Sequence, residues 1–226
     1  MERFVVLASS TTLSPSKSNL IPCHQTITVG FVQPAPGNPT QQRKVKEVVK
    51  QWEAVANIKF RFASTGVEAN NAMIRVSFQP NRGSWSFLGK GALTAVPKPQ
   101  PTLNLAWVKS GEVTEPKERG VILHEFGHAI GYLHEHQSPR RGEKLTLNEK
   151  GGAASSLVIS RTVILTLHAV IFAYAAATQV PPWDEEKTRH NIINVYNVED
   201  VSSFSEVDFT SIMMCVLFSF TAGLPS

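Results

Sequence analysis

Cysteine is scarce in this sequence of 226 residues, which contains only Cys23 and Cys215. Two cysteines exclude a disulfide-rich scaffold, although one long-range bridge and two free thiols both remain open. Charged residues make up 18% and apolar residues 42% of the chain, which excludes a disordered polymer and a coiled coil. A chain of this length without internal repeats predicts one hydrophobic core, either undivided or split into two lobes around a cleft.

Positive charge is in slight excess and is dispersed along the chain. The formal net charge is +4. Basic residues gather in two short groups, at 43–50 and 140–144, without the dense clustering and interleaved aromatic side chains of a nucleic-acid surface. We therefore expect no nucleic-acid partner.

Long apolar runs are also missing. The N-terminal run at 4–8 is shorter than a secretory h-region, so no signal peptide is visible and the compartment stays open. Residues 151–180 carry a single charge, Arg161, where average composition would give about five. The uncharged stretch at 162–177 falls short of the ~18–20 residues that span a bilayer. A buried helix is therefore favoured over a membrane anchor.

The first half of the chain shows strand and helix patterns in turn. Apolar alternation predicts strands at 27–32, 58–62, 73–78 and 103–108, and glycines bound an expected edge strand at 83–91. Apolar residues at helical spacing predict a helix over 41–56, and Pro116 and Glu118 suit the first turn of a second helix from 116 onward. This order indicates an α/β or α+β unit whose sheet is backed by helices.

The most informative stretch is His124-Glu125-x-x-His128-x-x-Gly131-x-x-His134. On a helix, His124 and His128 lie about 40° apart in azimuth and roughly 6 Å apart along the axis, so both imidazoles can reach one metal ion. Glu125 lies roughly 100° around the helix, where it can reach a water beside the metal. In a continued helix His134 would face away. Gly131 can adopt a positive φ, end the helix and return His134 as a third ligand.

Three neutral imidazoles leave zinc its full charge and an open fourth position, the arrangement of catalytic zinc sites. Water bound there can become a nucleophile near neutral pH. The full pattern would arise by chance on the order of 10⁻⁵ times in a chain of this composition. We therefore predict one catalytic Zn²⁺ held by His124, His128 and His134, with Glu125 as general base.

The same residues carry a family resemblance. The motif resembles the metzincin zinc-protease signature, and the following Glu135 makes it most similar to the astacin branch. Four further segments are similar to the family. The Met-turn is resembled by Ser211-Ile212-Met213-Met214 and the edge strand by Ser84-Trp85-Ser86-Phe87-Leu88-Gly89. The strand before the active-site helix is resembled by Thr102-Leu103-Asn104-Leu105 and the helix before the Met-turn by Asn191-Ile192-Ile193. The resemblance covers about 27–150 and 181–214.

The resemblance implies an α+β metzincin-like fold, with a twisted N-terminal sheet, two long helices and a smaller, mostly irregular or helical C-terminal lobe. It implies a zinc metalloendopeptidase whose protein or peptide substrate extends along the edge strand at Ser84, Trp85 and Ser86. It places Met213 beneath the zinc. For Glu135 it implies contact with an N-terminus made by cleavage, and a plain surface carboxylate is the alternative.

One departure favours a second function. The family has a tyrosine two residues after the Met-turn methionine, where it helps to stabilise the oxyanion, and this chain has Cys215 there. Loss of one oxyanion donor costs roughly 10²–10³ in rate. The alternative is therefore a catalytically impaired zinc-binding domain of the same fold that recognises extended peptides. The oligomeric state stays open.

The domain division follows from these patterns. We expect a loose lead-in at 1–26, a catalytic domain at 27–214 with an anomalous apolar insertion at about 151–180, and a divergent tail at 215–226. The insertion and the tail are either a lineage-specific addition or foreign text, such as a retained intron or a shifted reading frame.

Overall fold

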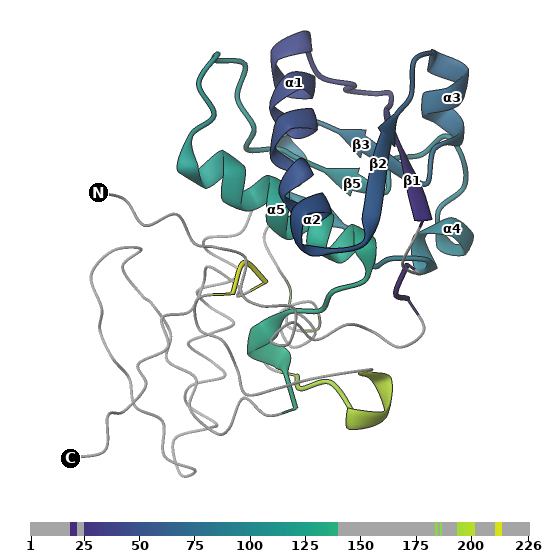
Figure 1. Ribbon diagram of the computed structural model, residues 1–226, viewed down its shortest axis with the longest axis vertical. Coiled ribbons are helices and arrows are strands. Elements are labelled where there is room, and N and C mark those ends of the chain that lie inside the picture. Colours follow the sequence, from purple (N-terminus) through teal and green to yellow (C-terminus); the bar gives the residue numbers. More distant parts are fainter. Residues whose placement is uncertain are drawn as a thin grey trace, which may run out of the picture.

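The computed structural model in Figure 1 describes residues 19–21, 25–139, 184, 186, 194–201 and 211–213. The predictions for most of the lead-in, for the insertion at 151–180 and for the tail at 215–226 therefore lie outside the described residues, as do both cysteines. Within the described residues, no helix combines the length and the apolar character needed to cross a membrane.

A five-stranded mixed sheet forms the centre of the described chain. Its strands lie in the order β2-β1-β3-β5-β4. Their bounds are β1 (Gln25–Phe31), β2 (Ile58–Phe62), β3 (Ile74–Ser77), β4 (Trp85–Ser86) and β5 (Leu103–Asn104). The first four strands in this order are parallel, and β4 pairs antiparallel with β5 at the edge. In the register, Val29 of β1 lies opposite Phe62 on one side and Ile74 on the other.

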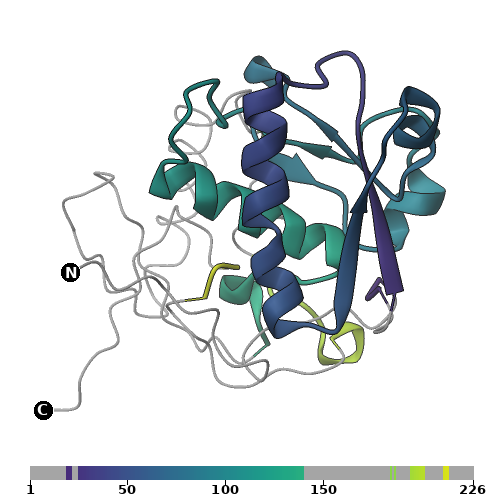
Figure 2. The same cartoon turned by 45° about the horizontal axis from the view of Figure 1, so that its top comes forward.

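Five α-helices and three short 3₁₀ helices accompany the sheet in the described part of the chain. They are α1 (Pro39–Val48), α2 (Lys50–Val55), α3 (Gly66–Asn71), α4 (Gly91–Ala95), α5 (Pro116–Ile130), η1 (Pro80–Arg82), η2 (Glu135–Gln137) and η5 (Val198–Asp200). Helices α1 and α5 pack against each other on one side of the sheet (Figures 1 and 2). The fold is therefore α+β, as predicted.

The helix predicted at 41–56 is present but is divided. It begins earlier because Asn38 caps it: the Asn38 side chain accepts from the backbone N–H of Gln41, and the Gln41 side chain accepts from the N–H of Asn38. Pro39 occupies the first turn, where no N–H is needed. Helix α1 ends at Val48 and α2 starts at Lys50.

Two further predictions need correction. The edge strand expected over 83–91 is limited to β4 at 85–86, because the chain turns at Gly89 and starts α4 at Gly91. The strand expected over 103–108 ends at 104, because residues 105–108 form a turn closed by a Val108 N–H to Leu105 carbonyl bond. Helices α3 and α4 have no counterpart in the sequence predictions.

The hydrophobic core lies between the sheet and the helices α1, α2 and α5. Trp52 of α2 is fully buried and donates its indole N–H to the carbonyl of Leu123 in α5 at 3.0 Å. Its ring stacks on Tyr132 with centroids 5.4 Å apart. Phe126 of α5 packs edge-on against Phe60 of β2. These contacts fix α5, which carries the histidine motif, against the core.

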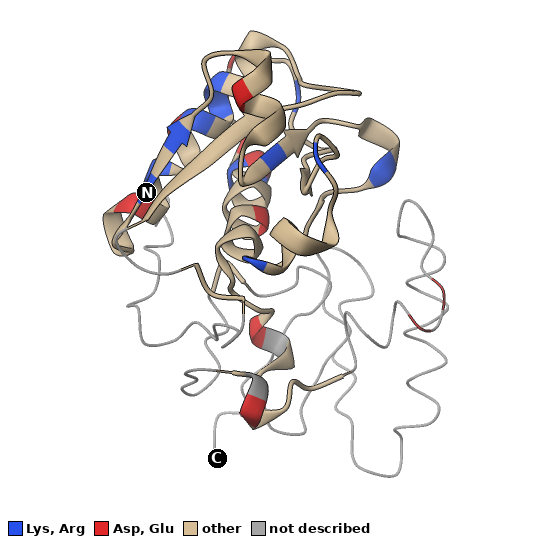
Figure 3. Cartoon of the chain, turned by 90° about the vertical axis from the view of Figure 1, so that its right-hand side faces the viewer, with Lys and Arg blue, Asp and Glu red and all other residues tan. Residues whose placement is uncertain are grey.

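One ion pair is buried between α1 and α5. Figure 3 shows lysine and arginine along α1, and among them Lys44 is buried. Its ammonium lies 2.9 Å from a carboxylate oxygen of Glu118, and both side chains are almost fully buried. The Glu118 carboxylate also accepts from the backbone N–H groups of Lys109 and Glu115. Burial alone would raise the pKa of Glu118, but Lys44 and the two N–H donors outweigh it and lower that pKa.

Candidate metal centre

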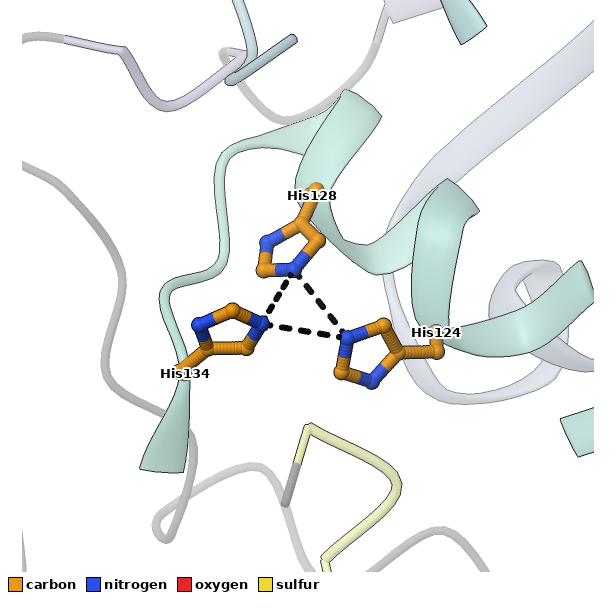
Figure 4. A group of neighbouring side chains, drawn as sticks. All are labelled: His124, His128 and His134. Carbon is orange, nitrogen blue, oxygen red and sulfur yellow. Dashed lines mark hydrogen bonds between the residues drawn. The ribbon is translucent and has the colours of Figure 1, made fainter. Parts of the chain in front are cut away.

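Helix α5 carries the first two histidines and ends where the sequence predicts. His124 and His128 stand one turn apart on α5, which ends at Ile130. Gly131 adopts φ 109°, in the left-handed region, and its N–H closes the helix by bonding to the carbonyl of His128. The predicted helix end is confirmed, and the chain returns so that His134 faces the other two rings (Figure 4).

The three imidazoles converge through one nitrogen each. The Nε2 atoms are 3.2 Å apart between His124 and His128, 3.0 Å between His128 and His134, and 3.3 Å between His124 and His134. Within the described part of the chain, they form the one group of three side chains that could hold a metal ion.

The opposite nitrogens decide the protonation of the rings. Nδ1 of His124 contacts the carbonyl oxygen of Ile212 at 2.7 Å, and Nδ1 of His128 contacts that of Tyr132 at 2.8 Å. A carbonyl oxygen can only accept, so both Nδ1 atoms must carry the proton. Their Nε2 atoms are then unprotonated acceptors that face each other at hydrogen-bond distance.

Unprotonated nitrogens at this separation require a shared electrophile. Tetrahedral zinc with Zn–N bonds of about 2.0–2.1 Å separates two ligand nitrogens by about 3.3 Å, close to the observed spacing. Burial also lowers the pKa of His124, although its contact with Ile212 opposes that shift, so the neutral ligand form is favoured. The site therefore fits zinc in ligand type, tautomer and spacing.

Glu125 follows the first histidine and is 7% exposed. Burial raises the pKa of its carboxyl group to about 8. A cation at the neighbouring imidazoles would act in the opposite direction, because a nearby positive charge stabilises the carboxylate. Metal occupancy and the ionisation of Glu125 are thus coupled.

The segment at 211–213, in which the sequence predicts a Met-turn, contacts the first histidine of the triad through its backbone. Met213 is fully buried, and a Cβ added at Gly127 of α5 would lie 2.3 Å from its sulfur. Its N–H bonds to the Ser211 hydroxyl, and its carbonyl accepts from the N–H of Glu135. Ile212 supplies the carbonyl that orients His124. Met214 lies outside the described residues.

The alternative of a surface carboxylate for Glu135 is wrong. Its side chain is fully buried, because the chain folds back after His134 into η2 against the segment at 211–213. A buried carboxylate needs hydrogen-bond or charge partners within the protein, so Glu135 is surrounded by protein groups and not by solvent.

Two residues beside His134 are absent from the sequence predictions. Nδ1 of His134 contacts the side-chain oxygen of Gln137 at 3.1 Å, and the Tyr196 hydroxyl donates to the same oxygen at 2.9 Å. Gln137 is 1% exposed. Burial raises the pKa of Tyr196 to about 12, so its hydroxyl stays protonated at neutral pH. The position of Gln137 three residues after His134 was an available signal, whereas nothing in the sequence pointed to Tyr196.

The predicted substrate strand lies at the edge of the sheet. Ser84, Trp85 and Ser86 are partly exposed, and the last two form β4. Just beyond them, Gly89 donates its N–H to the carbonyl of His128 at 2.9 Å. The segment that follows the edge strand is thus bonded to the end of the helix that carries His124 and His128.

The family model of the astacin peptidases matches residues 24–155, which is more than half of the chain. The chain belongs to the astacin family. Its histidine triad and its membership of a peptidase family together point to zinc as the metal of this site.

Two curated relatives match part of this astacin. The dorsal-ventral patterning protein tolloid of Drosophila melanogaster is 31% identical over 104 residues, which is 46% of this chain and 8% of that protein. Nematocyst expressed protein 6 of Nematostella vectensis is 42% identical over 41 residues, which is 18% of this chain and 14% of that protein. The chain therefore spans a small share of the length of these relatives.

Two solved structures of myroilysin resemble this chain over most of its length. One aligns with a TM-score of 0.69 at 27% identity and covers 91% of this chain and 86% of that one. The other has a TM-score of 0.57 at 26% identity and covers 96% and 83%. The similarity to myroilysin supports the α+β architecture described above.

Proposed function

We propose that this protein is a zinc-dependent endopeptidase in which His124, His128 and His134 bind a single Zn²⁺ and Glu125 is the general base. The observation that carries the proposal is the convergence of three Nε2 atoms within 3.0–3.3 Å. Membership of a peptidase family supports the reaction class.

The side chains of the site have distinct tasks in this reaction. When bound, zinc would polarise the scissile carbonyl and the attacking water. A carboxylate oxygen of Glu125 accepts the proton of that water and passes it to the nitrogen of the leaving amine. The low exposure of Glu125 keeps bulk water from competing for this proton.

Peptide binding is assigned to the sheet edge at Ser84, Trp85 and Ser86. The edge of β4 that faces away from β5 offers backbone N–H and C=O groups with which an extended peptide can pair. The bond between Gly89 and His128 supports this assignment, because it holds the edge next to the triad. Met213 is assigned as the apolar floor beneath the metal.

The proposal is tested by peptide cleavage. Zinc-loaded protein should hydrolyse an internally quenched peptide, a chelator should abolish the activity, and added zinc should restore it. Glu125→Gln should reduce kcat by about 10²–10⁴-fold while zinc remains bound, because only the proton transfer is removed.

The alternative function makes a different prediction. Cys215 stands where the family has an oxyanion-stabilising tyrosine, which favours a peptide-binding domain with impaired catalysis. In that case zinc-loaded protein binds extended peptides but hydrolyses them no faster than Glu125→Gln does. That result would reject the enzyme.

A further inference from the structure

His134 is held differently from the other two imidazoles. His124 and His128 stand on α5 and donate from Nδ1 to backbone carbonyls, so helix and backbone fix both rings. His134 follows the helix, and its Nδ1 contacts a side chain, that of Gln137. The orientation of the third imidazole thus depends on a side chain, which a substitution can remove.

The Gln137 amide is itself oriented. Its Nε2 donates to the carbonyl of Asn194 at 3.0 Å, which turns Oε1 toward His134. Because Oε1 can only accept, it requires the proton of His134 on Nδ1 and leaves Nε2 of His134 unprotonated. Gln137 therefore selects the tautomer that the metal site needs.

Tyr196 completes the arrangement from a distant part of the sequence. Its hydroxyl donates to the same Oε1 at 2.9 Å, and its backbone N–H donates to the Gln137 carbonyl at 3.0 Å. These two bonds and the Asn194 contact attach the segment at 194–196 to η2 directly behind His134.

We infer that Gln137, held by Tyr196, is a positioning residue that sets the tautomer and orientation of His134 toward the metal. This inference rests on the proposed function, which assigns His134 as a zinc ligand. Outer hydrogen bonds of this kind typically change metal affinity by 10–100-fold when they are removed.

Zinc affinity of the full chain, measured by competition with a chromogenic chelator, tests the inference. Gln137→Leu should raise the zinc dissociation constant by about 10–100-fold. Gln137→Glu should lose less affinity than Gln137→Leu, because a carboxylate oxygen also accepts from Nδ1–H, although it cannot replace the bond to the Asn194 carbonyl. Tyr196→Phe should raise the constant by about 3–10-fold, the equivalent of one lost hydrogen bond.

A matched control lies in α1. The side-chain amide of Gln41 also both accepts and donates hydrogen bonds: it accepts from the N–H of Asn38 and donates to the carbonyl of Val108. Gln41→Leu should leave zinc affinity unchanged. In cobalt-loaded protein, the visible absorption spectrum should change in Gln137→Leu and be preserved in Gln41→Leu.

Several outcomes would overturn the inference. Wild-type affinity in both Gln137→Leu and Tyr196→Phe would do so, as would an equal loss in Gln137→Glu and Gln137→Leu. If Gln137→Leu does not fold, Tyr196→Phe keeps the ring and carries the test. If the wild type cleaves no peptide but the variants still bind zinc more weakly than it does, the inference is supported and the proposed activity is contradicted. A wild type that binds no zinc contradicts both.

Discussion

At the scale of single residues, Gly131 determines how the histidine motif closes. Its φ of 109° lies in the left-handed region, and an added Cβ would lie 2.7 Å from the Cα of Leu20. The left-handed backbone alone costs an L-residue about 1–2 kcal/mol. Gly131→Ala should therefore lower the free energy of unfolding by more than that amount and weaken zinc binding, because His134 follows the turn.

Denaturant unfolding and a zinc titration measure both effects. The control is Gly120→Ala in the same helix, where an added Cβ meets nothing within 4 Å. Since alanine is favoured over glycine inside a helix, Gly120→Ala should stabilise the protein by about 0.5–1 kcal/mol. Equal effects at the two glycines would contradict the role given to Gly131.

At the scale of elements, the buried pair of Lys44 and Glu118 joins α1 to the start of α5. The folded-state pKa of Glu118 is lowered, so its contribution to stability is complete above the unfolded value of about 4.3. That contribution is lost as the pH falls through the folded pKa. At neutral pH, Glu118→Gln should lower the free energy of unfolding by about 3–5 kcal/mol, because the Lys44 ammonium stays buried without its carboxylate.

The pH dependence separates this contribution from general acid unfolding. The stability difference between wild type and Glu118→Gln should be largest near pH 7 and shrink below about pH 4, because the unfolded state then binds a proton that the folded state, with its lowered pKa, still excludes. Chemical unfolding at a series of pH values measures it. Parallel losses in the two proteins between pH 7 and pH 3 would show that the ionised carboxylate adds nothing.

At the scale of the whole molecule, metal binding connects parts of the chain that are far apart in sequence. The triad joins α5 to the segment after it, and its outer contacts reach 194–196 and 211–213. Zinc that binds only the folded state stabilises it by about 2.7 kcal/mol at 100 times the dissociation constant. Chelation should remove this increment, whereas a variant lacking His128 should show no zinc-dependent change in thermal unfolding.

The sequence predicted the parts of this architecture that depend on local pattern. Alternation located β1 and β2, and helical spacing located the helical stretch that is divided into α1 and α2. Pro116 in a first turn located the start of α5, and the glycine in the motif predicted the turn that returns His134. The short helices α3 and α4 lacked a sustained apolar period. The Lys44–Glu118 pair and the Gln137–Tyr196 contact join residues 74 and 59 positions apart, and a single sequence contains no direct record of such distances.

Zinc binding by the three histidines is tested most directly by a calorimetric titration of zinc into metal-free protein, alongside a variant in which His124, His128 and His134 are all alanine. We expect the wild type to bind one equivalent of zinc and the variant to bind none at the same concentrations. Absence of binding to the wild type, or equal binding to both proteins, would contradict it.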